Sequence, residues 1–170
     1  IILGGPLSEL SVADYDRLFA INTRANWIIA KAAYPELKAS RGALVATASM
    51  SAHQPTPGLS AYSSSKAALI MLIRQLSVEW GPDGIRCNTV SPGPTLTPMT
   101  AAGYSDPSRR EQRESGIPLR KLGTAEDVAN AILFLLSDLA GQINGIDILV
   151  DGGMGNSLMV ATGAGTGQTK

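Results

Sequence analysis

The chain of 170 residues has very few of several residue types, and each shortage excludes something. A single cysteine, Cys87, cannot form an internal disulfide, which fits a reducing compartment, so we expect a cytoplasmic protein. A zinc site or a Ser–His–Asp hydrolase would have to rest on the single histidine, His53, so we expect neither, and no other metal site.

Charge of one sign is not in excess either, because 14 basic residues balance 14 acidic ones. No basic stripe is interleaved with aromatic residues, which argues against nucleic acid as a partner. The apolar runs are short and interrupted, so we expect no transmembrane span and no membrane partner. With 44% hydrophobic and 16% charged residues, the chain has the composition of one globular domain with a buried core.

Short apolar runs alternate with longer amphipathic segments along the chain. Three runs lack polar alternation, which is typical of parallel strands covered on both faces, and they span 42–48, 85–90 and 146–150. Apolar residues at helical spacing predict helices at 11–40, 60–80 and from Thr124 onward. This alternation predicts an α/β fold, with a doubly wound parallel sheet of three strands and flanking helices.

The remaining segments are less regular. Residues 95–122 include a charged cluster that we interpret as a solvated face, and we expect a short helix pair or a flap there. The glycines between 163 and 167 resemble half of a phosphate-binding loop, but the strand and helix that such a loop requires are missing. We therefore expect a flexible glycine-rich tail over 155–170.

The three predicted strands make a thin sheet. Its first strand would expose a long unpaired edge, which folded proteins avoid. The chain also starts abruptly, at Ile1 followed by a glycine-containing loop. We therefore interpret residues 1–154 as the C-terminal part of a larger doubly wound domain, present as a fragment or as a natural truncation.

A serine, a tyrosine and a lysine stand out at the end of the first predicted strand. Ser49 follows that strand, where open α/β sheets bind their ligands. Tyr62 and Lys66 are four positions apart, so they share one face of the helix at 60–80. Singly, these residues could be a strand-end serine, a first-turn aromatic and a surface lysine. Together they place a phenol beside a cation, which favours the phenolate and suits proton transfer near neutral pH.

Asn22 falls inside the helix predicted for 11–40. An asparagine in a helix interior competes for backbone hydrogen bonds and is unfavourable there. It is either a satisfied polar residue or an irregularity that directs an amide into a functional site.

Together these residues resemble a known family. Asn22, Ser49 and Tyr62-x-x-x-Lys66 occur in order, with the serine thirteen residues before the tyrosine. Ser91-Pro92-Gly93 follows the second predicted strand, and Val150-Asp151-Gly152-Gly153 closes the third. This combination resembles the classical type of the short-chain dehydrogenase/reductase family, over about residues 1–154.

The resemblance implies a Rossmann-type sheet and hydride transfer between a nicotinamide cofactor, NAD or NADP, and a secondary alcohol or ketone. It implies that Tyr62 is the general acid/base and that Lys66 lowers its pKa and binds the nicotinamide ribose. Ser49 would bind the substrate oxygen, and Asn22 would hold a water in a proton relay towards the lysine. The glycine-rich turn that binds the dinucleotide in this family has no counterpart here, so we expect this chain alone to be inactive.

The resemblance also implies the remaining site residues. The cofactor would contact Tyr62 and Lys66, together with Pro92, Gly93, Thr95 and Thr97. The substrate side would include Ser49, Ser51, His53, Pro94 and Met99, with Gln54 and Tyr104 as further candidates. For most residues of the substrate side, a purely structural role fits the sequence equally well.

The predicted helix at 60–80 carries two apolar stripes, so it needs more than one packing partner. One partner is the sheet, and the other could be a second subunit, giving a dimer or tetramer through the helices at 11–40 and 60–80. The alternative to an enzyme is a non-catalytic association module, or a pseudoenzyme without its cofactor site, in which these helices serve only to bind another chain.

Overall fold

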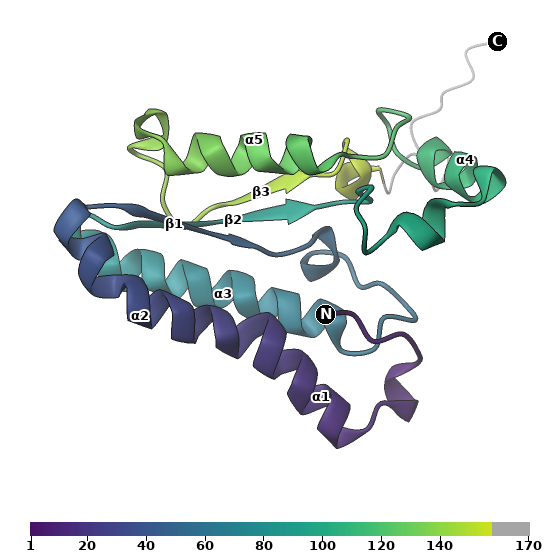
Figure 1. The fold of residues 1–170 in the computed structure, drawn as a ribbon, viewed down its shortest axis with the longest axis horizontal. Helices are drawn as coiled ribbons and strands as arrows, with labels where there is room; N and C mark the ends of the chain where they lie inside the picture. The colour runs from purple at the N-terminus through teal and green to yellow at the C-terminus, as the bar shows by residue number, and fades with distance from the viewer. Residues whose placement is uncertain (158–170) are drawn as a thin grey trace, which may run out of the picture.

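Three parallel strands form one sheet between two layers of helices (Figure 1). The computed structural model describes residues 1–157. The strands are β1 (Ala43–Thr47), β2 (Arg86–Pro92) and β3 (Asp147–Val150), in that spatial order. The main helices are α1 (Val12–Phe19), α2 (Ala25–Ser40), α3 (Tyr62–Trp80) and α5 (Ala125–Leu136). The predicted α/β fold, with helices on both faces of a parallel sheet, is confirmed.

Each face of the sheet has its own core. On one face Leu69 and Ile73 of α3 are buried with Ala30 of α2 against β1 and β2. On the other face Leu135 of α5 is buried against Val90 of β2. The apolar runs of the strands are therefore covered on both sides, which is why they lack the polar alternation of a half-exposed strand.

The register of the sheet gathers the strand ends at one edge. Thr47 of β1 lies beside Val90 of β2, and Pro92 of β2 lies beside Val150 of β3. The residues that follow the three strands therefore share the carboxyl edge of the sheet, where ligands bind in this kind of fold. In the described residues β1 is an edge strand, paired on one side only.

The helix predicted for 11–40 is divided. A π-helical turn, Ala20–Arg24, separates α1 from α2, and Asn22 lies in this turn with 3% of its surface exposed. The extra residue in a π turn shifts the helical phase and turns a polar side chain inward, and such turns are frequent at functional sites. The irregularity inferred from the sequence is present, but the prediction of one continuous helix was wrong.

The helix predicted from residue 60 begins two residues later, at Tyr62. Ser60 has a left-handed backbone (φ 48°), which is incompatible with continuing the helix backwards. Its N–H donates to the Gly5 carbonyl and its hydroxyl to the Leu3 carbonyl, so the N-terminal segment holds this turn in place.

The segment between β2 and α5 forms a short helix pair, as one of the two expectations had it. A 3₁₀ turn, Ala101–Tyr104, is followed by α4 (Pro107–Ser115), which Asp106 caps by accepting from the N–H of Ser108. The charged side chains of α4 are largely in solvent. At the end of the described part, a 3₁₀ turn spans Met154–Asn156. Residues 158–170 lie outside the described residues, so the tail over 155–170 stays a prediction.

No helix within residues 1–157 combines the length and apolar character that crossing a membrane requires.

Two asparagines fasten the loop that leads into β3. Asn88, fully buried in β2, donates to the Ile143 carbonyl at 3.0 Å and accepts from the Ile146 N–H at 3.1 Å. Asn144 accepts from the Cys87 N–H and donates to the Ser77 carbonyl. A single amide thus satisfies two backbone groups of the loop at once, which apolar residues cannot do.

Replacing Asn88 by alanine should lower the free energy of unfolding by about 1–3 kcal/mol, because two partly buried backbone groups lose their partner. Urea unfolding followed by circular dichroism measures the change. Asn130→Ala, on the exposed side of α5, is the matched control and should leave stability nearly unchanged. If both substitutions lowered the free energy of unfolding equally, the effect would come from losing any amide, and the role of Asn88 in holding the loop would be contradicted.

Candidate active site

Ser49 lies just beyond the carboxyl end of β1. Its backbone is extended, and its hydroxyl accepts from the Ser51 N–H at 3.2 Å, which caps the short 3₁₀ turn Met50–Ala52. Only 9% of its surface is exposed. The preceding residue, Ala48, donates its N–H to the Val90 carbonyl, so the strand fixes the backbone up to the serine.

Tyr62 and Lys66 occupy the first turn and a half of α3. The Lys66 Nζ donates to the Thr47 carbonyl at 3.0 Å and lies 6.0 Å from the centre of the Tyr62 ring. This bond ties the start of α3 to the end of β1, two residues before Ser49. The predicted trio of serine, tyrosine and lysine is therefore brought together at the carboxyl edge of the sheet.

Burial dominates the electrostatics of this trio. It raises the pKa of Tyr62, and a hydrogen bond with the Ser49 hydroxyl opposes that rise. Burial also lowers the pKa of Lys66, because a partly desolvated ammonium is less stable than one in water. The expectation that Lys66 brings the pKa of Tyr62 below its usual value is not met, because burial raises this pKa and only the Ser49 hydrogen bond opposes the rise.

Asn22 reaches the same helix from the π turn. Its Nδ2 donates to the Ser65 hydroxyl at 3.0 Å and to the Ile1 carbonyl at 2.9 Å. Its Oδ1 accepts from the Ile1 amino group at 2.7 Å. The amide therefore lies beside α3 at the residue before Lys66, and its contact with the lysine is indirect.

The predicted cofactor residues surround the end of β2. A Cβ on Gly93 would lie 2.6 Å from the Cβ of Asp151 and 3.4 Å from the Met50 sulfur, so only glycine fits between the two strand ends. Thr95 is buried and donates to the Gly93 carbonyl at 2.9 Å. The hydroxyls of Thr97 and Thr100 lie 3.1 Å apart, within the loop that follows. These hydrogen bonds lie within the loop and fix its conformation after β2.

The predicted substrate residues do not form one cluster. The Ser51 hydroxyl pairs with that of Thr56 at 2.9 Å, within its own loop. Pro94 accepts from the Gly123 N–H, and Met99 is 72% exposed. Tyr104 lines a cavity of 550 Å³ with Arg113 of α4, away from the residues that surround Ser49.

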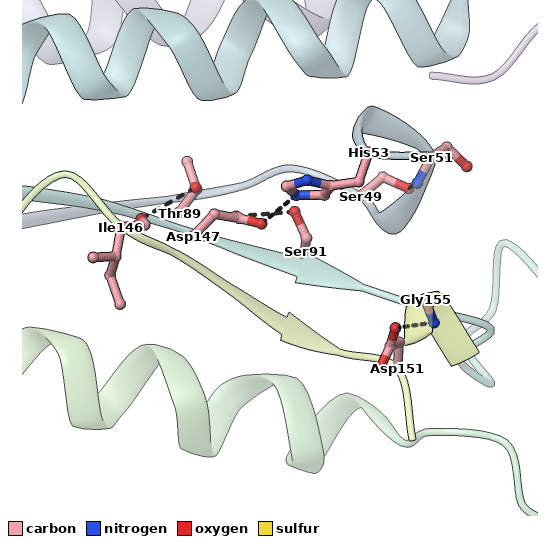
Figure 2. Close-up of polar contacts among 9 residues, drawn as sticks. All are labelled: Ser49, Ser51, His53, Thr89, Ser91, Ile146, Asp147, Asp151 and Gly155. Carbon is pink, nitrogen blue, oxygen red and sulfur yellow. Dashed lines mark hydrogen bonds and ion pairs between the residues drawn. The ribbon is translucent and has the colours of Figure 1, made fainter. Parts of the chain in front are cut away.

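His53 has a different partner from the one expected of a substrate contact. Figure 2 shows its ring lying between the turn that carries Ser49 and strand β3. Its Nε2 is 2.6 Å from Oδ2 of Asp147, whose other oxygen accepts from the Ser91 hydroxyl at 2.9 Å. Sequence reasoning missed Asp147, and it named Ser91 in a motif without giving it a role. An aspartate between Ile146 and Ile148 in an apolar strand was the available signal, since a buried carboxylate needs a partner.

Other chemistries find little support in the described part of the chain. Residues 1–157 contain no group of three or more His, Cys, Asp or Glu side chains placed to hold a metal ion. Cys87 is buried, which raises the pKa of its thiol to about 11 and makes it a poor nucleophile.

Comparison with known proteins agrees with this geometry. Residues 2–155 match the family model described as enoyl-(acyl carrier protein) reductase. The chain is 40% identical over 162 residues to 2,3-dihydro-2,3-dihydroxybenzoate dehydrogenase of Escherichia coli, covering 90% of this chain and 65% of that protein. It is 36% identical over 155 residues to carbonyl reductase [NADPH] 2 of Sus scrofa, covering 90% and 64%. An oxidoreductase of the short-chain dehydrogenase/reductase family from Burkholderia thailandensis has a similar structure, with a TM-score of 0.88 and 34% identity over 95% of this chain and 64% of that one.

The chain belongs to the short-chain dehydrogenase/reductase family. The resemblance inferred from the motifs is thereby confirmed, as is the Rossmann-type fold. The chain spans less than two thirds of the length of these two curated relatives.

Replacing Lys66 by methionine should stabilise the fold at neutral pH, because it removes an ammonium that burial penalises. The folded-state pKa of Lys66 is below its unfolded value of 10.5, so the unfolded chain holds more protons between these two values. Wild-type stability therefore gains from this group as the pH rises through that window, and the advantage of the variant should shrink towards pH 10.5.

Urea unfolding of the wild type and Lys66→Met at several pH values measures this difference. Lys31→Met, on the exposed face of α2, serves as the control for the loss of a lysine and should change the free energy of unfolding little. An advantage of Lys66→Met that stayed constant up to pH 10.5 would contradict the burial penalty.

Proposed function

We propose that the protein is an oxidoreductase that transfers a hydride between NAD or NADP and a secondary alcohol or ketone, with Tyr62 as the general acid/base. The observation that carries this proposal is the meeting of Ser49, Tyr62 and Lys66 at the carboxyl edge of the sheet. Ser49 follows β1, and Tyr62 and Lys66 lie in α3, which the bond from Lys66 to the Thr47 carbonyl joins to β1.

The donor groups suit a nicotinamide nucleotide. The Lys66 ammonium has three N–H groups, and one of them binds the Thr47 carbonyl. The others can donate to ribose hydroxyls beside the Tyr62 phenol. Gly93 has no side chain, so the end of β2 lies against Asp151, and a flat ring would lie against the backbone of 92–95. The cofactor, when bound, supplies or accepts the hydride.

Residues of this chain would donate and accept the proton of the reaction. A phenol is protonated at neutral pH, and burial raises the pKa of Tyr62 further, so it can donate its proton to a carbonyl oxygen during reduction. Ser49 would donate a hydrogen bond to the same oxygen and hold it near the phenol. In the oxidation direction the phenolate is required, and the cation of Lys66 would then stabilise it. Asn22 would support this arrangement through Ser65, next to the lysine.

The substrate is proposed to be a small alcohol or ketone. One relative is named a dehydrogenase of 2,3-dihydro-2,3-dihydroxybenzoate and another a carbonyl reductase, and both names describe such chemistry. Ser51, His53, Pro94 and Met99 remain proposed residues of the substrate side. Either nicotinamide cofactor fits the proposal, and a cytoplasmic location agrees with the single buried thiol of Cys87.

Replacing Tyr62 by phenylalanine should lower the turnover number by about 10²–10⁴-fold, because the proton donor is lost. Cofactor affinity should change little, since Lys66 is retained. The protein as its gene encodes it is assayed with cyclic secondary alcohols, including 2,3-dihydro-2,3-dihydroxybenzoate, and NAD⁺ or NADP⁺, and reduced nicotinamide is followed by absorbance.

The matched control is Tyr15→Phe, an exposed tyrosine of α1 that stacks on Phe19. Its turnover should equal that of the wild type. Full activity of Tyr62→Phe would contradict the assignment. Wild-type protein that is inactive with both cofactors, yet self-associates, would support the alternative of a non-catalytic association module.

We also propose a homo-oligomer that forms through α1, α2 and α3. Several large apolar side chains on these helices are exposed, namely Val12, Tyr15, Ile21, Trp27, Ile28, Ile29, Met71 and Val78. Met71 and Val78 of α3 are 61% and 76% exposed, so these two side chains face away from the sheet. Apolar surface of this extent is unusual on a monomer and supports an interaction between subunits.

The double substitution Met71→Lys and Val78→Lys should shift the protein to a smaller species in sedimentation velocity, because two buried ammonium groups would oppose the interface. Gln112→Lys on α4 is the control and should leave the sedimentation coefficient unchanged, as α4 lies away from these helices (Figure 1). The same sedimentation coefficient for the double variant and the wild type would rule out this face as the interface.

A further inference from the structure

The carboxylate of Asp147 lies under the turn that carries Ser49, and the proposed mechanism does not use it. Its side chain is 2% exposed, and both of its oxygens are bound. One accepts from the Ser91 hydroxyl at 2.9 Å and the other pairs with His53 Nε2 at 2.6 Å (Figure 2). His53 and Asp147 are 94 positions apart in the sequence, so this contact exists only in the folded chain.

The imidazole is oriented by this contact. A carboxylate can only accept, so Nε2 carries the hydrogen in this pair. His53 ends the 3₁₀ turn, and its N–H donates to the Met50 carbonyl at 3.0 Å. The Ala52 N–H donates to the Ser49 carbonyl at 2.9 Å, and the Ser51 N–H donates to the Ser49 hydroxyl. The position of His53 is therefore transmitted to Ser49 through one short hydrogen-bonded turn.

The turn is thus attached at both ends. At its start, Ala48 is bonded to β2, and at its end the His53 ring is bonded to β3 through Asp147. Ser91 in β2 holds the carboxylate in place and is itself fully buried. Without the bond from His53 to Asp147, only the bond from Ala48 to β2 would fix the chain next to Ser49, and a long loop would follow.

A role in stability alone does not account for this arrangement. Taking a carboxylate out of water is costly, and well-packed apolar residues usually give equal or greater stability than a buried ion pair. Cys87, four residues before Ser91 on the same strand and fully buried, shows that β2 accepts a small side chain of low polarity. The polar array lies where a catalytic hydroxyl would need fixed geometry.

We propose that Asp147, supported by Ser91, is a positioning residue that fixes Ser49 through His53. This inference rests on the proposed function, because it gives Ser49 a task that depends on its position. A displacement of about 1 Å of a catalytic group can lower the rate by about 10²-fold. Loss of the contact between His53 and Asp147 should therefore lower the turnover number measurably.

The test uses steady-state kinetics of the protein as its gene encodes it, with the cyclic alcohols and the cofactors named above. His53→Ala should lower the turnover number about tenfold and leave cofactor affinity unchanged, because the residues on the cofactor side are untouched. His53→Gln, which retains an N–H donor able to reach Asp147, should recover most of the loss. Ser91→Ala leaves the turn intact and should lower the turnover number about threefold.

The deciding measurement is made in the Ser49→Ala background. If His53 acts through Ser49, adding His53→Ala there should cost no further turnover, because effects of residues that act as a unit are not additive. Losses that multiply would overturn the proposal, since His53 would then act independently of Ser49. An unimpaired His53→Ala variant would overturn it as well.

Asp83→Asn is the matched control, since Asp83 pairs with Lys38 at 2.8 Å, near the opposite edge of the sheet from Ser49. Turnover of this variant should equal that of the wild type. Should His53→Ala fail to fold, as thermal unfolding will show, Ser91→Ala and His53→Gln carry the same comparison. Wild-type protein without nicotinamide-dependent turnover would contradict the proposed function, whereas an active wild type with an unimpaired His53→Ala variant contradicts only this inference.

Discussion

The bond from the Lys66 ammonium to the Thr47 carbonyl is the contact on which the site depends. It joins the first turns of α3 to the last residue of β1, so the side chains that follow each element face a common space. Ser49 comes two residues after the strand, and Tyr62 one helical turn before the lysine. A charged donor bound to a strand-end carbonyl also keeps the ammonium within a partly buried site, where it would otherwise turn towards water.

Burial shapes the chemistry of this space more than charge does. It raises the pKa of the Tyr62 phenol and lowers that of the Lys66 ammonium, so both groups are biased towards their neutral forms. The Ser49 hydroxyl works against this bias at the tyrosine. In such a site the protonated phenol can donate to a carbonyl oxygen, and a further positive charge is needed to favour the phenolate. The polar array of His53, Asp147 and Ser91 extends the same buried region towards β3.

Irregular backbone occurs where the chain positions these groups. The π turn at Ala20–Arg24 places Asn22 against Ser65, and the left-handed Ser60 ends the loop just before Tyr62. Gly93 allows the end of β2 to lie against Asp151. Each feature interrupts a regular element, and each lies next to a residue of the proposed site, which is where folded proteins tend to accept such costs.

The sequence alone predicts the three strands, the helix that carries Tyr62 and Lys66, and the central trio, because hydrophobic period and four-residue spacing are local properties. It also determined the family, since the order and spacing of the motifs are specific. The folded chain was needed to show that His53 pairs with Asp147, that Asn22 lies in a π turn, and that burial raises the pKa of Tyr62. These outcomes depend on contacts between residues far apart in the chain and on how much water the fold excludes, and neither can be read from neighbouring residues.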